Sequence, residues 1–321
     1  DLDANNQSNG SVTSTISGTG FLTPVAIDAA NSLIVKNWSV SGLDLALASG
    51  TTYNVADFPK IWIDNLTGSY TGDTFVSDSA YAMTGQIAFN TVTAINLSSK
   101  SLTTNFDNTV LSKFIELTIL RLDNNNISVI DLSSLHKLDV VDIGQNSLIT
   151  NIDTSENLLL TDLFCDRCSL TSVDFSTNIL LTDISCERNS LTSVDFSNNI
   201  LLVNIRTGSN ILTSVDFSNN ILLDELRIEN ANLSALDISN NTLLETLYCY
   251  VNNLNSLDIT NNINLTSIIC YSNQLDAAAN SQILIDLDGH GLSNGYLSST
   301  IFGGGTLTTA GLAAKAALLL K

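Results

Sequence analysis

The chain has 321 residues, of which 44% are apolar, and its 32 acidic side chains outnumber 12 basic ones to give a formal net charge of −20. A negative field of this size repels nucleic acid and anionic membranes, which argues against both as partners. No stretch reaches the roughly 18 apolar residues of a membrane span, so we expect no membrane insertion.

Residues 1–20 contain mainly Ser, Thr, Asn and Gly with almost nothing to bury, which predicts a flexible arm. The same arm could instead order against a partner subunit. Because the chain begins at Asp1 with neither a methionine nor a signal sequence, we expect it to be a processed or truncated product.

Residues 21–90 alternate short β-like runs with turn-rich segments, and the runs are 32–40, 43–47, 52–55 and 59–64. This pattern predicts a small β-rich module, in which Trp38 and Trp62 belong to a core rather than to a ligand platform. Any self-assembly is expected to use this module and the arm before it.

A fixed repeat organises residues 91–276. The pattern L-x-x-L-x-(L/C)-x-x-N-x-L recurs every 21 residues, with one step of 22 near Asn151. Its copies begin at Leu117, Leu138, Leu160, Leu181, Leu202, Leu223, Leu244 and Leu265. A second phrase, LTSVDFSNNILL at Leu191 and again at Leu212, lies between them. A period of about 20–30 residues is typical of a solenoid, whose units bury their apolar edges by stacking.

Each unit carries the leucine pattern twice, and in this it resembles the nested bacterial class of leucine-rich repeats known as IRREKO. The resemblance implies a mainly β fold, a leucine-rich repeat solenoid over residues 91–276, and specifies little about a ligand. Residues 92–102 have the same spacing with Lys100 in place of the asparagine, which predicts a degenerate first coil. The helical spacing of Leu111, Phe114 and Leu117 predicts one short helix, and this region would cap the solenoid.

Strand alternation predicts which side chains face the core. In one unit, those expected inward are Leu181, Ile184, Cys186, Val194 and Phe196. Those expected outward are Asp183, Ser185 and Asp195. One phenylalanine from each of three units is expected to stack as a spine, namely Phe175, Phe196 and Phe217.

An asparagine at the turn of each unit resembles the family's ladder asparagine, whose amide pairs with backbone groups of the adjacent coil. These residues are Asn125, Asn146, Asn189, Asn210, Asn252 and Asn273. Cys168 and Ala231 replace it in two units. At Ala231 we expect either a local weak point or a neighbouring asparagine, Asn230 or Asn232, in its place.

Four of the five cysteines fall in the inward strand column, and they are Cys165, Cys186, Cys249 and Cys270. Buried free thiols acting as small hydrophobes are expected. Coils about 4.8 Å apart would also allow a bridge between the first two or the last two. Cys165 and Cys168 form a C-x-x-C pair, but no second pair accompanies it, so we expect no zinc site.

Residues 277–321 are expected to form a C-terminal cap. Residues 277–287 suit a helix before a Gly-rich turn, and the Ala- and Leu-rich residues 309–320 favour a second helix. Asp286 and Asp288 faintly resemble the opening of a calcium loop, but the later carboxylate is missing, which favours a helix-terminating turn. The cap resembles those that follow such repeats in bacterial and phage-encoded surface proteins.

One aspartate per coil recurs at the same outward position of the second half: Asp131, Asp153, Asp174, Asp195, Asp216, Asp237 and Asp258. Stacked about 4.8 Å apart, adjacent carboxylates repel one another. Hydrogen bonds from nearby serine hydroxyls and turn amides are expected to offset the repulsion. A row of bound calcium ions is the alternative.

The outward positions of the first half differ from unit to unit. One column is Arg121, Asp142, Phe164, Ser185, Arg206, Arg227, Tyr248 and Ile269. The next is Asp123, Gly144, Asp166, Glu187, Gly208, Glu229, Tyr250 and Tyr271. We call these two columns the variable face, since a face that varies over a fixed frame is how a solenoid builds a binding surface.

Six residues in the C-terminal half of the variable face are predicted to bind a ligand: Arg206, Arg227, Tyr248, Tyr250, Ile269 and Tyr271. Tyrosine and arginine are enriched at binding hot spots, because a ring offers rigid area and a guanidinium offers a planar fork of donors. Sugar rings or an acidic peptide would suit such a patch. Alternatively, the aromatic pairs only stabilise the sheet.

The sequence contains no Gly-rich phosphate loop, no G-x-S-x-G motif and only two histidines, so we expect neither an enzyme nor a cofactor. The preferred function is binding or adhesion at a bacterial surface, or on a phage particle that attaches to one, with a protein or glycan receptor as partner. The alternative is a structural subunit of a virion or an extracellular filament. Both imply an extracellular, cell-surface or virion-surface location.

Overall fold

The computed structural model describes residues 93–99, 102, 108–112, 114–291, 295–300 and 303–320. Before residue 93 it describes six short strands: β1 (Ser11–Thr13), β2 (Ser39–Ser41), β3 (Asp44–Ala46), β4 (Thr52–Asn54), β5 (Tyr81–Ala82) and β6 (Gln86–Ile87). β1 pairs with β2 in parallel, whereas β3 with β4 and β5 with β6 are antiparallel pairs. β3 and β4 fall within two of the expected runs. The module boundaries at 20 and 90, Trp38 and Trp62 lie outside the described residues.

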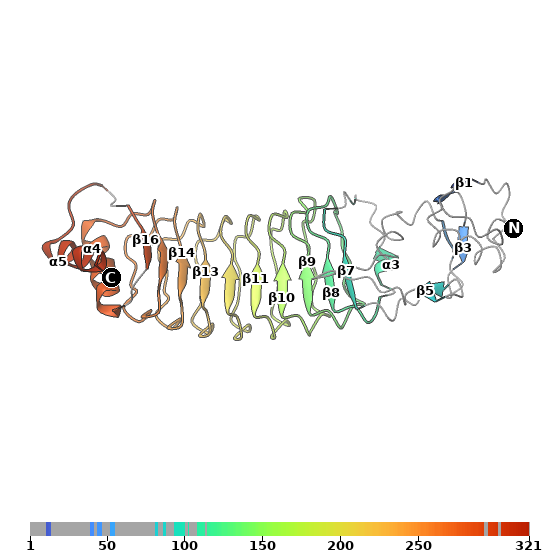
Figure 1. The fold of residues 1–321 in the computed structure, drawn as a ribbon, viewed down its shortest axis with the longest axis horizontal. Helices are drawn as coiled ribbons and strands as arrows, with labels where there is room; N and C mark the ends of the chain where they lie inside the picture. The colour runs from blue at the N-terminus through green and yellow to red at the C-terminus, as the bar shows by residue number, and fades with distance from the viewer. Residues whose placement is uncertain are drawn as a thin grey trace.

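The rest of the described chain is a solenoid around one parallel sheet, as the repeat predicts (Figure 1). Its ten strands follow one another in chain order. They are β7 (Ala94–Asn96), β8 (Ile119–Arg121), β9 (Val140–Asp142), β10 (Asp162–Phe164), β11 (Asp183–Ser185), β12 (Asn204–Arg206), β13 (Glu225–Arg227), β14 (Thr246–Tyr248), β15 (Ser267–Ile269) and β16 (Tyr296–Ser298). β7 confirms the degenerate first coil, and β16 adds a strand from the segment expected to form the cap.

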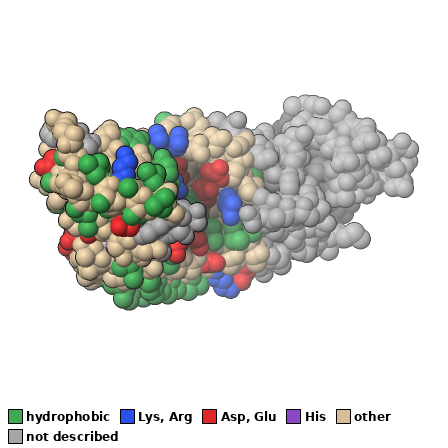
Figure 2. Space-filling view, turned by 60° about the vertical axis from the view of Figure 1, so that its left-hand side comes forward, with side chains coloured by type: hydrophobic (Ala, Val, Ile, Leu, Met, Phe, Trp, Pro, Cys, Tyr) green, Lys and Arg blue, Asp and Glu red, His purple; other side chains and the backbone are tan. Residues whose placement is uncertain are grey.

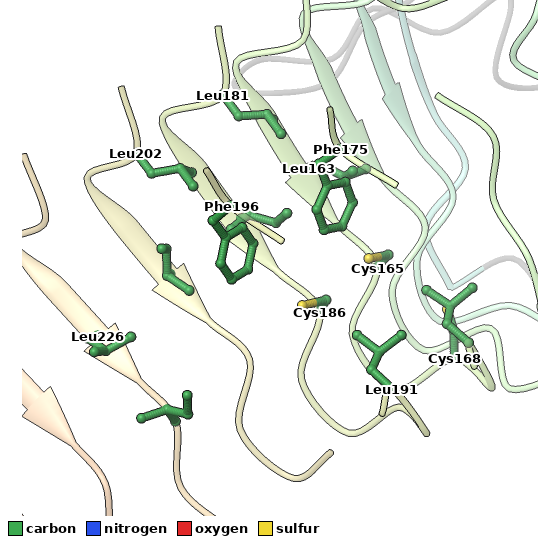
Figure 3. Packing of buried hydrophobic residues seen from close by; sticks show 14 of the residues in the cluster. Leu163, Cys165, Cys168, Phe175, Leu181, Cys186, Leu191, Phe196, Leu202 and Leu226 are labelled. Carbon is green, nitrogen blue, oxygen red and sulfur yellow. The ribbon is translucent and has the colours of Figure 1, made fainter. Parts of the chain in front are cut away.

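The interior of the solenoid is filled by the inward columns, as predicted, although Ser185, which was expected outward, is buried too at 6% exposed. Leu181, Ile184 and Cys186 are fully buried, and the same positions repeat in the neighbouring coils (Figure 3). Phe196 stacks between Phe175 and Phe217, with ring centroids 6.1 and 6.2 Å away. All five cysteines are buried free thiols, which confirms their role as small hydrophobes. The core is therefore one continuous column that no coil could close alone.

The predicted asparagine ladder is present. In Asn210, Nδ2 donates to the carbonyl oxygens of Thr207 in its own coil and Cys186 in the coil before, at 2.9 and 3.0 Å. Oδ1 accepts from the backbone N–H of Leu191 at 3.0 Å. The same three bonds recur at Asn125, Asn146, Asn189, Asn252 and Asn273. Each ladder asparagine thus joins two coils where the strand ends.

Among the described residues, neither Asn230 nor Asn232 makes the ladder bonds in place of Ala231. The backbone N–H of Ala231 donates to Oδ1 of Asn252, the ladder asparagine of the next coil, at 3.0 Å. Asn230 and Asn232 both adopt positive φ, of 51° and 60°, whereas the other coils place one such residue before the ladder position. Asn252 therefore pairs one extra backbone group beyond its own ladder bonds.

A second column of asparagines lies in the other half of the coils and was not expected. Its members are Asn157, Asn178, Asn199, Asn220, Asn241 and Asn262, all at most 1% exposed. In each of the last five, Nδ2 donates to the backbone carbonyl of the same column's asparagine in the preceding coil. Thr154 donates its hydroxyl to Oδ1 of Asn178, whereas Oδ1 of the other five has no hydrogen-bond partner among the described residues.

The aspartate column is held by local turns, which confirms the first of the two expectations. Oδ1 of Asp195 accepts from the backbone N–H of Ser197 at 2.8 Å, and the other aspartates do the same with the residue two positions on. Hydrogen bonds from that backbone N–H and the adjacent hydroxyl hold the pKa of Asp195 below its usual value. The other six carboxyl pKa values are lowered for the same reason.

We therefore expect the melting temperature to be insensitive to calcium and to chelator at neutral pH. It should fall with acid instead. Because the folded-state pKa values lie below those of an aspartate in the unfolded chain, their stabilisation is present above the unfolded pKa and is lost as pH falls through the folded values. Scanning calorimetry from pH 7 to pH 2, with and without calcium, tests both parts. A melting temperature raised by calcium would support the alternative, a row of bound calcium ions.

Both ends of the solenoid carry helical turns. At the N-terminal end α3 (Asn108–Leu111) is shorter than expected, and Phe114 and Leu117 are buried in turns that follow it. At the C-terminal end lie α4 (Ala277–His290) and α5 (Thr309–Leu318) (Figure 1). α4 continues past the predicted end at 287, so that Asp286 and Asp288 lie inside the helix rather than in a turn. It ends at Gly291 with φ of 72°.

Candidate ligand-binding face

The variable face is built by strands in register. Arg206 of β12, Arg227 of β13, Tyr248 of β14 and Ile269 of β15 are consecutive neighbours across the sheet. The residue between the two columns is buried in each of these coils, so alternation turns the flanking side chains outward. All six predicted ligand-binding residues are half-buried, neither part of the core nor fully exposed. The structure therefore gathers them on one continuous patch.

Two aromatic contacts organise this patch. The rings of Tyr250 and Tyr271 stack with centroids 4.8 Å apart and planes inclined by 20°. The guanidinium carbon of Arg227 lies 4.8 Å from the centroid of the Tyr248 ring, a cation–π contact. These contacts fix the side chains before any ligand arrives, which reduces the entropy lost on binding.

The arginines are already engaged by carboxylates of the same sheet. Arg206 contacts Asp183 through Nη1 at 3.1 Å and Glu225 through Nε at 2.7 Å. Nε of Arg227 also lies 2.7 Å from Oε1 of Glu225, although its N–H is not directed at that oxygen. Both guanidinium groups are thus neutralised locally, and the attraction expected for an acidic peptide is largely cancelled.

The N-terminal half of the variable face is acidic. Burial and the charge of Asp123 raise the pKa of Asp142 to about 6, against a hydrogen bond from the backbone N–H of Gly144. The carboxylate of Asp166 lies over Gly144, where an added Cβ would come 2.7 Å from Oδ1, and burial raises its pKa also. Glycine at this position therefore makes room for a carboxylate from the next coil.

Gly208 makes room for a second carboxylate in the same way. An added Cβ there would lie 2.6 Å from Oε2 of Glu229. Glu229 is only 9% exposed, and its Oε2 is buried without a hydrogen-bond partner among the described residues. Burial raises the pKa of Glu187, and the charge of Glu229 raises it further. Figure 2 shows acidic side chains gathered beside basic ones on the described surface.

An apolar stripe on the turns of the second half was not expected. It consists of residues 53–56% exposed, namely Leu158, Ile179, Ile200, Ile221 and Ile263. The sequence signal was available, since Ile follows the second asparagine in four coils. The stripe is a second surface that a partner could cover. Receptor binding by variants of the stripe must therefore be compared with binding by variants of the variable face.

A cavity of about 430 Å³ lies between the last coil and the C-terminal cap. Its lining is mainly apolar, including Leu265, Leu284, Leu297 and Leu318, with Lys315 as its charged residue. None of the six predicted ligand-binding residues lines it. In the described part of the chain no group of three or more His, Cys, Asp or Glu side chains could hold a metal, and no helix is long and apolar enough to cross a membrane.

The fold resembles bacterial leucine-rich repeat structures. The functional domain of InlJ from Listeria monocytogenes, described as including a cysteine ladder, is 31% identical with a TM-score of 0.53, over 64% of this chain and 51% of that one. The internalin InlF of the same organism is 20% identical with a TM-score of 0.52, over 66% and 69%. A leucine-rich repeat protein of Leptospira interrogans is 18% identical with a TM-score of 0.56, over 66% and 57%.

No family model and no curated protein matches the sequence. The 21-residue coils, the ladder and the structural neighbours together define the class of protein: a leucine-rich repeat solenoid. InlJ, InlF and the Leptospira protein are all bacterial. The chain spans about half the length of the InlJ domain.

Proposed function

We propose that this protein binds or adheres to a receptor through the C-terminal half of its variable face. The observation that carries the proposal is the preformed patch of Tyr248, Tyr250, Tyr271 and Arg227, which is ordered by internal contacts and still partly exposed. Rigid aromatic side chains on a fixed frame supply contact area at low entropic cost. A protein receptor fits best, and a glycan is the second candidate.

A bacterial surface or a phage particle is the proposed setting. Support comes from the likeness to bacterial leucine-rich repeat proteins, of which the InlJ domain shares 31% identity. The strongly acidic composition is compatible with an extracellular location.

The double substitution Tyr250→Ser and Tyr271→Ser tests the face. The full chain is screened on protein and glycan arrays, and the variant should bind any captured receptor at least tenfold more weakly, or about 1.4 kcal/mol. Loss of the ring stack should also cost about 0.5–1.5 kcal/mol of stability, so circular dichroism must first show that the variant is folded.

The double substitution Ile200→Ser and Ile221→Ser is the matched control, because it removes two large side chains from the apolar stripe instead. It should leave attachment unchanged. Attachment lost in this control and retained in the tyrosine variant would move the binding surface to the stripe.

A further inference from the structure

The charges on the variable face are unequally satisfied. Arg206 contacts both Asp183 and Glu225, and Arg227 lies against Glu225 and the Tyr248 ring. The carboxylates of Glu187 and Glu229 have no such ion pair with a described residue. Burial and the charge of Glu229 raise the pKa of Glu187, and the charges of Arg227 and Arg206 act to lower it. No described cation contacts either carboxylate, so the charge left without a partner in the patch is negative.

Gly208 lies between the two carboxylates that lack an ion pair with a described residue. It lies one coil after Glu187 and one coil before Glu229 in the same column, and it has no side chain to separate them. The Glu229 carboxylate occupies the space over Gly208. Tyr250 follows Glu229 one coil later in the same column. Burial raises the pKa of its hydroxyl, and the charge of Glu229 contributes. We call Glu187, Gly208, Glu229 and Tyr250 the acidic notch.

A buried carboxylate oxygen with no donor is costly, because desolvation is uncompensated. Oε2 of Glu229 is in this state in the free protein. An ammonium or guanidinium group entering the notch would supply a charge-assisted hydrogen bond and a counter-charge, with an aromatic ring alongside. Because Oε2 is closed to solvent, entry of a cation requires the Glu229 side chain to turn outward.

We propose that the acidic notch receives a lysine or arginine side chain of a protein partner. This inference rests on the proposed function and gives the receptor a chemistry: a basic polypeptide segment whose cationic residue anchors in the notch while its neighbours cover Tyr250 and Tyr271. It replaces the acidic ligand that the arginines alone suggested.

The test uses the full chain and three fluorescent decapeptides in which glycine alternates with lysine, arginine or glutamate, at physiological salt. The variant Glu187→Gln with Glu229→Gln should bind the lysine and arginine peptides at least tenfold more weakly. Since a chain of net charge −20 attracts any cation, the control is Glu156→Gln with Asp195→Asn. It removes the same two charges from exposed positions outside the variable face and should change binding less than twofold.

Equal weakening in the two variants would show diffuse attraction and overturn the notch, as would no weakening in either. The receptor captured on arrays separates this inference from the proposed function. If its binding falls in the tyrosine variant but not in the glutamate variant, the variable face binds and the notch does not receive a cation. If it falls in neither, both proposals are wrong.

Discussion

Replacing Asn252 by alanine should lower the free energy of unfolding by about 3–5 kcal/mol, since it leaves several buried backbone groups unpaired at about 1–3 kcal/mol each. Asn252 donates to the carbonyls of Ile228 and Cys249 and accepts from the N–H groups of Leu233 and Ala231. It is 6% exposed, so water cannot replace these partners. The effect should exceed that of any other ladder asparagine, because Asn252 also serves the coil in which Ala231 stands.

Urea denaturation followed by circular dichroism measures the loss. Asn253→Ala is the control, because this neighbouring asparagine is exposed and its side chain makes one long contact, 3.4 Å from Gln274. Its replacement should cost less than about 1 kcal/mol. Equal losses in the two variants would mean that the ladder bonds add little beyond what solvent supplies.

Replacing Phe196 by alanine should cost a similar amount, about 3–5 kcal/mol, through lost transfer energy and the cavity left behind. Phe196 is fully buried in the middle of the three-ring stack, so neither neighbouring coil can collapse into the space. Ile238 and Ile259 occupy the same position in later coils. Phe196→Ile should therefore cost less than about 1.5 kcal/mol.

The comparison between the two variants distinguishes packing from ring stacking. Both are measured by the same urea titration. If isoleucine is as damaging as alanine, the aromatic contact itself stabilises the stack and volume is secondary.

The sequence was sufficient to predict the solenoid because its period and its ladder asparagines have one structural interpretation. Asn210 and Phe196 lie where the repeat put them. The second asparagine column was missed, although Asn199 and its equivalents do not change across six coils. The turn conformation was also missed: Val251 and Arg188 have φ of 55° and 53°, and neither residue type signals a left-handed turn.

The binding face was only partly predictable. Strand alternation correctly placed Tyr248, Tyr250 and Tyr271 outward. It could not show that Glu225 takes up both arginines or that Glu229 folds over Gly208, because those outcomes depend on rotamers and on contacts across coils. Consequently the sequence predicted which residues form the patch. It did not predict that the charge left without a partner there would be negative.

The second asparagine column gives the solenoid a direction. Each amide donates to the carbonyl of its counterpart one coil nearer the N-terminus, from Asn262 back through Asn241 and Asn220. Such a row is polar, with acceptors facing one way at every step, and aligned bonds polarise one another. The two ends of the stack are therefore chemically unlike. The direction stays within one molecule, because α4 and α5 follow the last coil and the row stops at Asn262.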